Sequence, residues 1–369
     1  MGSLPPQPST PSSSLTCRIY ASFCSTNLSS HANISNWIDC YDPSTNAWHR
    51  VTTLPGLTDN QVLKGFSMAA VGDFVYVVGG RLCHKIPGRE SDEFVEKNLE
   101  VRQSVMRYNV RDGVWSKCAP MRVPRLDFAC AVCDGRIYVA GGQSTLPSAR
   151  GLRSAEVYDP TLDQWRALPD MSLLRYKCVG VTWQERFHVV GGFAERGDSG
   201  GSYRVSRQWC TMERSSAEVY SCDDAKWDLI EGMWRLDVPP NQIVAVDEKL
   251  FSSGDCFKSW KGHIEVYDGK VNIWNEVDGS HLETLSSPIS TSGNDWPPIK
   301  RLYITMAPIG TLLYFLAGYR LPGEISRVTC NVHVFDTSAI RDGWTSLEPT
   351  EEEGEKELCS HCCVVRHTL

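Results

Sequence analysis

The fold is decided by the stretch from Arg125 to Trp165, which reads RLDFACAVCDGRIYVAGGQSTLPSARGLRSAEVYDPTLDQW. Short apolar segments alternate in it with glycine and aspartate turn signals. Its parts in order are the strand Phe128–Cys133, the turn Asp134-Gly135, the strand Ile137–Ala140, the doublet Gly141-Gly142, the strand Ala155–Asp159 and the closing Trp165. Short β-rich segments joined by an Asp-Gly turn are typical of antiparallel hairpins. The stretch therefore predicts one antiparallel sheet, with its fourth strand around Trp165.

The same unit recurs along the chain, and this recurrence determines the architecture. Four further copies are recognised: Phe66–Trp115, Arg175–Trp227, Asn241–Trp274 and Arg301–Trp344. A sixth copy is divided between the two ends of the chain. Its second strand, third strand and anchor are Arg18–Ala21, Trp37–Asp42 and Trp48, and its missing first strand is His361–Val365. A C-terminal strand that completes the N-terminal unit would leave no open sheet edge.

These units resemble the kelch-repeat family of the galactose oxidase/kelch superfamily. Tyr-Asp-Pro-x-x-x-x-Trp turns such as Tyr158–Trp165 are similar to those of plant kelch proteins. The resemblance implies an all-β fold, a six-bladed kelch β-propeller whose ring is closed by a C-terminal strand completing the N-terminal blade. Residues 17–369 are expected to form this single propeller, and residues 1–16, rich in proline and serine, a flexible tail.

The composition limits the classes of function. A formal net charge of −7 and a pI of about 5.8 argue against general nucleic-acid binding, which needs a basic excess. The first residues lack the basic start and apolar core of a secretory signal, and no membrane segment is expected. The fifteen cysteines are expected to be reduced thiols. The predicted location is the cytoplasm or the nucleus.

Long insertions are predicted on one face of the propeller only. The turns between first and second strands are tiny in every unit, whereas Arg81–Gln103 and Phe193–Arg214 follow second strands and Asn275–Lys300 joins two units. Because successive antiparallel strands place their turns alternately on opposite faces, both kinds of long connection share a face. Binding sites usually lie on the loops of a rigid scaffold, so this face is the expected binding face.

Residues at the mouth of the central channel stand just before each innermost strand. Alignment of the six units places six residues there: Gly65, Asp127, Lys177, Pro240, Tyr303 and Ser360. In kelch modules that hold acidic peptides, basic and hydroxyl side chains near these positions make the contacts. The resemblance therefore implies a set of partner-binding residues at and beside the mouth: Arg81, Arg125, Gln143, Arg175, Lys177, Phe193, Arg301, Tyr303 and Arg320. Three of these arginines recur at the same position of the unit, and for them an alternative is pairing with carboxylates of the blades. The arginines are Arg125, Arg175 and Arg301, and the carboxylates are those of residues such as Glu156, Glu218 and Glu265.

Motifs for catalysis or cofactor binding are not recognised. Cys130-x-x-Cys133 and Cys359-x-x-Cys362 have zinc-like spacing, but residues three apart on a strand point to opposite faces, so structural thiols are expected. The iron motif Glu-x-x-x-Asp-x-x-x-His of plant nitrile-specifier proteins, which are also kelch propellers, is absent. No metal and no cofactor are predicted. The acidic run Glu351–Glu357 is interpreted as a solvated linker.

Two functions of different classes remain open. The first is a protein-interaction module, a scaffold or substrate-recognition propeller whose partner is an acidic peptide segment or a ubiquitin-ligase adaptor. The residues before the first strand are too few for an F-box. The second is a metal-independent enzyme or small-molecule-binding specifier protein of plant specialised metabolism, with Asp127, Lys177 and Tyr303 as acid–base candidates. A broad open face would favour the first function, and a closed, ligand-sized cavity the second.

Overall fold

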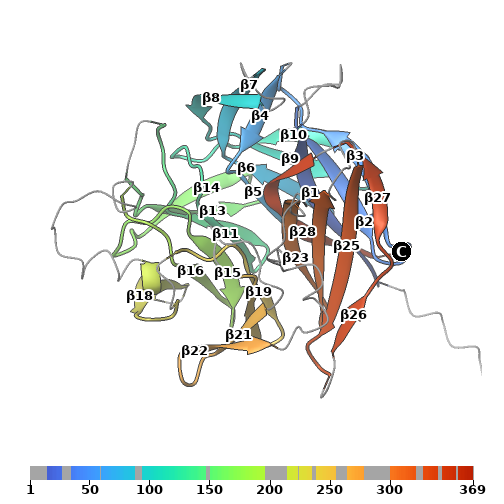
Figure 1. Ribbon diagram of the computed structural model, residues 1–369. Coiled ribbons are helices and arrows are strands. Elements are labelled where there is room, and N and C mark those ends of the chain that lie inside the picture. The colour runs from blue at the N-terminus through green and yellow to red at the C-terminus, as the bar shows by residue number, and fades with distance from the viewer. Residues whose placement is uncertain are drawn as a thin grey trace, which may run out of the picture.

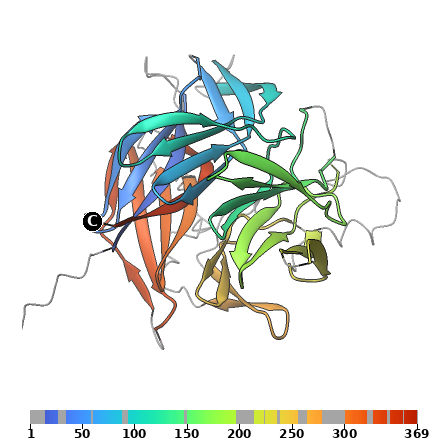
Figure 2. The ribbon, with the colours of Figure 1, turned by 180° about the vertical axis from the view of Figure 1, so that it is seen from behind.

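The computed structural model is an all-β protein built from antiparallel sheets (Figures 1 and 2). The residues that it describes are 15–26, 35–58, 60–87, 94–146, 150–195, 214–222, 224–234, 238–254, 264–277, 300–320, 327–339, 343–354 and 356–368. Within these ranges the strands form six sheets of four or five strands and one three-stranded sheet. In the same ranges, no helix has the length and apolar character needed to cross a membrane.

The larger sheets are numbered by their order along the chain. Sheet 1 contains β28 (Lys356–Thr368), β1 (Leu15–Ser25), β2 (Trp37–Asp42) and β3 (Ala47–Thr53). Sheet 2 contains β5 (Ser67–Val71), β6 (Phe74–Val78), β9 (Val105–Asn109) and β10 (Val114–Cys118). Sheet 3 contains β11 (Ala129–Cys133), β12 (Arg136–Ala140), β13 (Ala155–Asp159) and β14 (Gln164–Leu168).

Sheet 4 contains β15 (Val179–Trp183), β16 (Arg186–Val190), β17 (Ala217–Ser221) and β18 (Lys226–Ile230). Sheet 5 contains β19 (Ile243–Val246), β20 (Lys249–Ser252), β21 (Ile264–Asp268) and β22 (Ile273–Val277). Sheet 6 contains β23 (Lys300–Ile309), β24 (Leu312–Arg320), β25 (Arg327–Asp336) and β26 (Trp344–Ser346), and β27 (Thr350–Glu353) also pairs with β25. The five uninterrupted repeat units of the sequence thus each form one sheet.

The innermost strands of the six sheets contact one another in order. β5 contacts β11, β11 contacts β15, β15 contacts β19 and β19 contacts β23, while β28 contacts both β23 and β5. The two opposite views show the outer strands of each sheet extending away from this centre (Figures 1 and 2). Within the described ranges, the side chains that line the central space come from these innermost strands or from the residues just before them.

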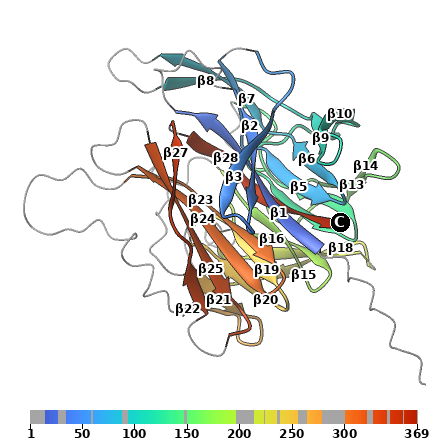
Figure 3. The same cartoon turned by 90° about the vertical axis from the view of Figure 1, so that its right-hand side faces the viewer.

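Sheet 1 joins the two ends of the chain, as the divided repeat predicts. β28 pairs antiparallel with β1, with Arg18 opposite Val365, Ile19 opposite Val364 and Tyr20 opposite Cys363. The two strands run together beside β23 (Figure 3). Pairing begins at Leu15, opposite Thr368, and most of the tail expected over residues 1–16 lies outside the described residues.

The Tyr-Asp-Pro turn connects the third and fourth strands through side-chain hydrogen bonds. In sheet 3 the Asp159 carboxylate accepts a bond from the Thr161 amide at 2.9 Å, and the Tyr158 hydroxyl donates to Asp163 at 2.6 Å. Asp163 has a positive φ of 51°, which aspartate tolerates better than most residues. Trp165 then donates from Nε1 to the Ala119 carbonyl at 2.9 Å. Because Ala119 follows sheet 2, Trp165 ties sheet 3 to the sheet before it.

The glycine doublet permits a close approach between neighbouring sheets. Gly141 has a φ of +68°, and a Cβ added to it would lie 2.7 Å from the Arg175 carbonyl oxygen. The next amide, of Gly142, donates to that same carbonyl at 2.8 Å. Only glycine combines this backbone conformation with such a short distance. The doublet is therefore part of the seam between sheets 3 and 4.

The first long insertion is a hairpin and not the loop that the sequence suggested. Within Arg81–Gln103, β7 (Arg81–Pro87) pairs with β8 (Phe94–Val101), and β7 also pairs with β4 (Gln61–Lys64) of the connection between sheets 1 and 2. This three-stranded sheet lies at one end of the molecule (Figure 1). Most of Phe193–Arg214 and of Asn275–Lys300 lies outside the described residues.

Candidate functional site

A central cavity of about 810 Å³ is lined by residues of all six larger sheets. Its lining includes every residue that the alignment of the repeats placed at the channel mouth: Gly65, Asp127, Lys177, Pro240, Tyr303 and Ser360. The equivalent positions of the six units therefore converge in space. This cavity is the candidate site.

A backbone ladder presents three of the mouth residues in one conformation. Gly65, Asp127 and Lys177 have positive φ values of 62°, 52° and 53°. The Asp127 amide donates to the Gly65 carbonyl at 2.9 Å, and the Lys177 amide donates to the Asp127 carbonyl at 2.7 Å. Pro240 follows in the series and has no amide hydrogen to continue it. The left-handed backbone thus places Asp127 and Lys177 side by side at the mouth.

The charged side chains of the lining carry a small positive excess. Lys177 is exposed, whereas Asp127 and Arg301 are half-buried. Burial lowers the pKa of Arg301, and Tyr319 acts in the opposite direction. Burial also lowers the pKa of His361 to about 4 against a hydrogen bond with the Asn241 backbone, so this imidazole is neutral at pH 7. With two cations and one carboxylate, the lining suits an anionic group better than a cationic one.

Tyr303 does not complete the predicted acid–base trio. Its side chain is buried, with its hydroxyl 2.9 Å from Cys330 Sγ and its ring 5.0 Å from that of Phe23. Burial raises its pKa well above the ordinary value, and the nearby Cys330 and Glu352 add to the rise. The hydroxyl therefore stays protonated and is directed into sheet 6, away from Asp127 and Lys177.

Two of the proposed partner-binding arginines are structural. Arg125 and Arg175 are fully buried, which corrects the expectation that they contact a partner. Arg125 Nη2 lies 2.9 Å from Glu156 Oε1, and Arg175 Nε lies 3.2 Å from Glu218 Oε1. Each guanidinium also donates to the carbonyl of the first glycine of a doublet, for Arg125 that of Gly141 at 2.8 Å. The alternative interpretation, pairing with a carboxylate of the same sheet, is confirmed for these two residues.

The remaining candidates lie beside the mouth in different environments. Gln143 is buried, and its backbone N–H donates to the Leu126 carbonyl at 3.0 Å. Phe193 is buried against Tyr176, with ring centroids 5.6 Å apart. Burial therefore removes both from partner contact, contrary to the expectation.

Arg81 lies on β7, where it donates to Asn98 at 3.1 Å, and Arg320 ends β24 and is half-buried. Among the nine candidates, the cavity lining contains Lys177, Arg301 and Tyr303.

The cysteine pairs with zinc-like spacing point to opposite sides of their strands, as predicted. Cys130 and Cys133 pack in different apolar clusters, and so do Cys359 and Cys362. Within the described ranges no group of three histidine, cysteine, aspartate or glutamate side chains is arranged to hold a metal ion.

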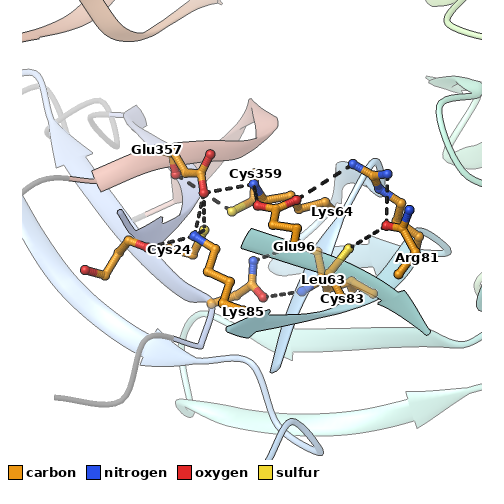
Figure 4. Close-up of polar contacts among 12 residues, drawn as sticks. Cys24, Leu63, Lys64, Arg81, Cys83, Lys85, Glu96, Glu357 and Cys359 are labelled. Atoms are coloured by element: carbon orange, nitrogen blue, oxygen red, sulfur yellow. Dashed lines mark hydrogen bonds and ion pairs between the residues drawn. The ribbon is translucent and has the colours of Figure 1, made fainter. Parts of the chain in front are cut away.

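The acidic run Glu351–Glu357 is not a solvated linker, because it contributes to β27 and to the start of β28. No sequence motif indicated this role. Glu357 Oε1 lies 2.8 Å from Lys64 Nζ and 2.6 Å from Lys85 Nζ, and Lys64 also pairs with Glu96 (Figure 4). Lys85 is only 2% exposed. Burial acts to raise the pKa of Glu357, but the two lysines outweigh it and lower this pKa to about 2. These four charges fasten the β4–β7–β8 sheet to β28.

Comparison with known proteins agrees with the repeat. Residues 29–55 and 124–172 match the Kelch motif family. The chain carries kelch repeats. It is 29% identical over 281 residues to the F-box/kelch-repeat protein At1g16250 of Arabidopsis thaliana, covering 69% of this chain and 72% of that protein. It is 31% identical over 261 residues to the F-box/kelch-repeat protein OR23 of the same plant, covering 64% and 55%.

More distant kelch proteins are similar as well. The Kelch repeat and BTB domain-containing protein 12 of Danio rerio is 24% identical, with 60% of this chain and 35% of that protein covered. Across most of these relatives the kelch chain spans well under two thirds of their length. Among solved structures, that of YjhT matches with a TM-score of 0.54 at 13% identity, covering 85% of this chain and 91% of that one. This likeness concerns the fold alone.

Proposed function

We propose that the kelch chain is a closed six-bladed propeller that acts as a protein-interaction module. Each larger sheet is then one blade, and the order of contacts among the innermost strands supports a complete ring, with β28 between β23 and β5. Residues 17–369 form this single unit in the proposal. Pairing of β1 with β28 supports closure by the C-terminal strand.

The observation that carries the function is the convergence of six equivalent mouth positions on one cavity. The exposed Lys177 and the half-buried Arg301 supply positive charge there, next to the insertion-bearing face. An acidic segment of a partner protein fits this charge, with its carboxylates near these two side chains. The partner is a ubiquitin-ligase adaptor or an acidic segment of a substrate protein, met in the cytoplasm or the nucleus.

Lys177 allows the proposal to be tested without damage to the fold. Its φ of 53° is one that glycine adopts at no steric cost, so Lys177→Gly removes the charge and keeps the backbone. Lys177→Glu reverses the charge at the same position. Lys249 is exposed at the start of β20, beside a turn of the opposite face, so Lys249→Glu is the matched control.

The experiment is affinity purification with crosslinking from native plant tissue, with the wild-type chain and these three variants as baits. A stoichiometric protein should be recovered with the wild type and Lys249→Glu, reduced several-fold with Lys177→Gly and lost with Lys177→Glu. Equal recovery with all four baits would show that the partner does not bind at the mouth. Recovery of no stoichiometric protein would refute the interaction module.

A second candidate, binding of a small molecule, is favoured by the size of the cavity. A volume of about 810 Å³ lies within the range of small-molecule pockets. Asp127 and Lys177 adjoin one another there and remain candidates for proton transfer, whereas the Tyr303 hydroxyl is turned away. Native mass spectrometry of the tissue-purified chain distinguishes the two candidates. A bound compound of constant mass without a protein partner would support this candidate.

A further inference from the structure

Two buried thiols lie together where the N-terminal strand meets the C-terminal strand. Cys24 on β1 is 0% exposed and Cys359 on β28 is 7% exposed, and both belong to one apolar cluster. Both thiols contact Glu357 (Figure 4). Cys24 Sγ donates to Oε1 of Glu357 at 3.2 Å, and Cys359 Sγ donates to the backbone carbonyl of Glu357 at 3.7 Å. Cys24 also acts to raise the pKa of the Cys359 thiol, as expected of two thiols packed around the same residue.

The strand pairing has an irregularity at this point. Cys24 is opposite Glu357 and Phe23 is opposite Leu358, but Ser22 is opposite Ser360. Cys359 is therefore the extra residue of a β-bulge, without a residue opposite it. A bulge disrupts the ladder locally and leaves the strand free to bend. This matters because a disulfide needs Cβ atoms about 3.5–4.5 Å apart, closer than ordinary diagonal neighbours in a sheet.

The charges around the pair distinguish the two sulfurs. Lys85 Nζ lies 3.3 Å from Cys24 Sγ, and reactive cysteines are found beside cationic side chains. Burial acts to lower the pKa of Lys85, but Cys24 and Glu357 outweigh it and raise this pKa, so the amine stays protonated. Burial raises the pKa of Cys359 well above the ordinary value, and Cys24 adds to this. Cys24 is thus the attacking sulfur and Cys359 the second one.

A route for a small oxidant exists. Cys359 and its neighbours Leu358 and Ser360 line the central cavity. A molecule the size of hydrogen peroxide that enters the mouth therefore reaches Cys359, and Cys24 packs in the same apolar cluster as Cys359.

We propose that Cys24 and Cys359 form a redox modification site that hydrogen peroxide converts to a disulfide. Cys24 sulfur attacks one peroxide oxygen, the O–O bond breaks, and a sulfenic acid and one water are formed. Cys359 sulfur then attacks Cys24 sulfur, the S–O bond breaks, and a second water leaves. The two thiols together lose two electrons and two protons, and the peroxide is reduced to water. The product joins the first strand of the chain to the last.

Oxidation is expected to stabilise the fold measurably. The cysteines are 335 positions apart, from 24 to 359, and a cross-link that closes so long a loop restricts the unfolded chain strongly. For a chain of this size the expected rise in Tm is about 5 °C. A reductant such as dithiothreitol should reverse it.

The test maps the thiols of the purified full chain before and after treatment with hydrogen peroxide. Free thiols are blocked with N-ethylmaleimide, and the unreduced protein is digested with trypsin and sequenced by tandem mass spectrometry. The expected product is a Cys24–Cys359 cross-link, 2 Da lighter than the two peptides together. Cys24→Ser and Cys359→Ser should abolish the cross-link and the rise in Tm.

Cys40 and Cys363 provide matched controls, because they are buried in the same apolar cluster and fall on the same tryptic peptides. Cys40→Ser and Cys363→Ser should leave the cross-link intact. A cross-link that persists in Cys24→Ser, or that is lost in Cys363→Ser, would overturn the proposal. A cross-link between Cys24 and Lys85, 14 Da heavier than the two free peptides together, would also overturn the proposal. So would oxidation of other thiols in the wild type without formation of this disulfide.

Discussion

Arg175→Met removes a buried guanidinium that connects several parts of sheet 4, and we expect it to weaken the fold strongly. Arg175 and Glu218 are both 0% exposed, with Nε 3.2 Å from Oε1. The same guanidinium donates to the Gly191 carbonyl at 2.8 Å, and to the Ser216 carbonyl at 3.2 Å and hydroxyl at 2.7 Å. Methionine fills a similar space but makes none of these bonds.

The expected loss of unfolding free energy follows from the buried groups that lose their partner when Arg175 is replaced. Breaking a buried pair by removing one partner costs about 3–5 kcal/mol. Glu218 keeps hydrogen bonds from the Ser172 amide at 2.7 Å and the Leu173 amide at 3.1 Å, which favours the lower end for the carboxylate. The buried carbonyls of Gly191 and Ser216 also lose a donor, which adds about 1 kcal/mol. The expected loss is therefore about 3–5 kcal/mol, or about 4–6 °C in Tm for a chain of this length.

Urea unfolding followed by tryptophan fluorescence measures the loss, with Arg136→Met as the control. Arg136 pairs with Asp159 at 3.3 Å, but its side chain is 46% exposed, so its replacement should leave the midpoint unchanged. The double variant Arg175→Met/Glu218→Leu should recover part of the loss, because no buried carboxylate is then uncompensated, although the Ser172 and Leu173 amides lose their acceptor. A single variant as stable as the wild type, or a double variant no better than the single one, would refute this reasoning.

Three further predictions concern the seam, the charged cluster and a buried histidine. Gly141→Ala should lower the free energy of unfolding, measured with urea, by about 2–3 kcal/mol, because the added Cβ would lie 2.7 Å from the Arg175 carbonyl oxygen. The control is Gly135→Ala, at a φ of +66° but with nothing within 4 Å of the added Cβ, which should lower it by only about 1 kcal/mol. Equal losses in the two variants would contradict the close contact at Gly141. Glu357→Gln should be less stable than the wild type at pH 7, and the difference should disappear as pH falls from 4.5 to about 2, since the pKa of Glu357 is lowered on folding; a difference independent of pH would exclude this ion pair as its source. Burial lowers the pKa of His188 to about 4, so stability should fall as pH drops from 6.5 to 4; a His188→Gln variant measured over the same range should lose that part of the decline.

Much of the fold could be predicted because the repeat is specified locally. The contacts that form each unit lie within that unit or reach only its neighbour, so each copy of the repeat determines its own sheet. Examples are the turn residues, the Gly141-Gly142 doublet and the Tyr158–Trp165 segment. The divided unit was predictable because its first strand was missing at one end of the sequence and present at the other. The β7–β8 hairpin was not, because its segments lack regular alternation and become strands by pairing with β4, which belongs to another connection.

The site was predictable in position and less so in chemistry. Alignment located the mouth, since equivalent positions of a repeat occupy equivalent places in space. It could not tell that Arg125 and Arg175 are buried while Arg301 lines the cavity, because that depends on the surroundings of each side chain. The recurring glutamate in the third strand was the available signal, and it supported the alternative that proved correct for Arg125 and Arg175. Glu357 gave no such signal, because its partner Lys64 is 293 positions away.

These observations connect the insertion that contains β7 and β8 to the pairing of the two terminal strands. Glu357 on β28 holds Lys64 of β4 and Lys85 of β7, so the small sheet of the insertions is fastened to the strand that pairs with β1. Two positions further along, Cys359 lines the cavity. A change at this point of β28, whether protonation of Glu357 or oxidation of Cys359, therefore acts on the small sheet, the cavity lining and the pairing of the two terminal strands together. Binding at the mouth and the redox state of the pair should consequently influence each other, because Cys359 lines the same cavity as Lys177 and Arg301.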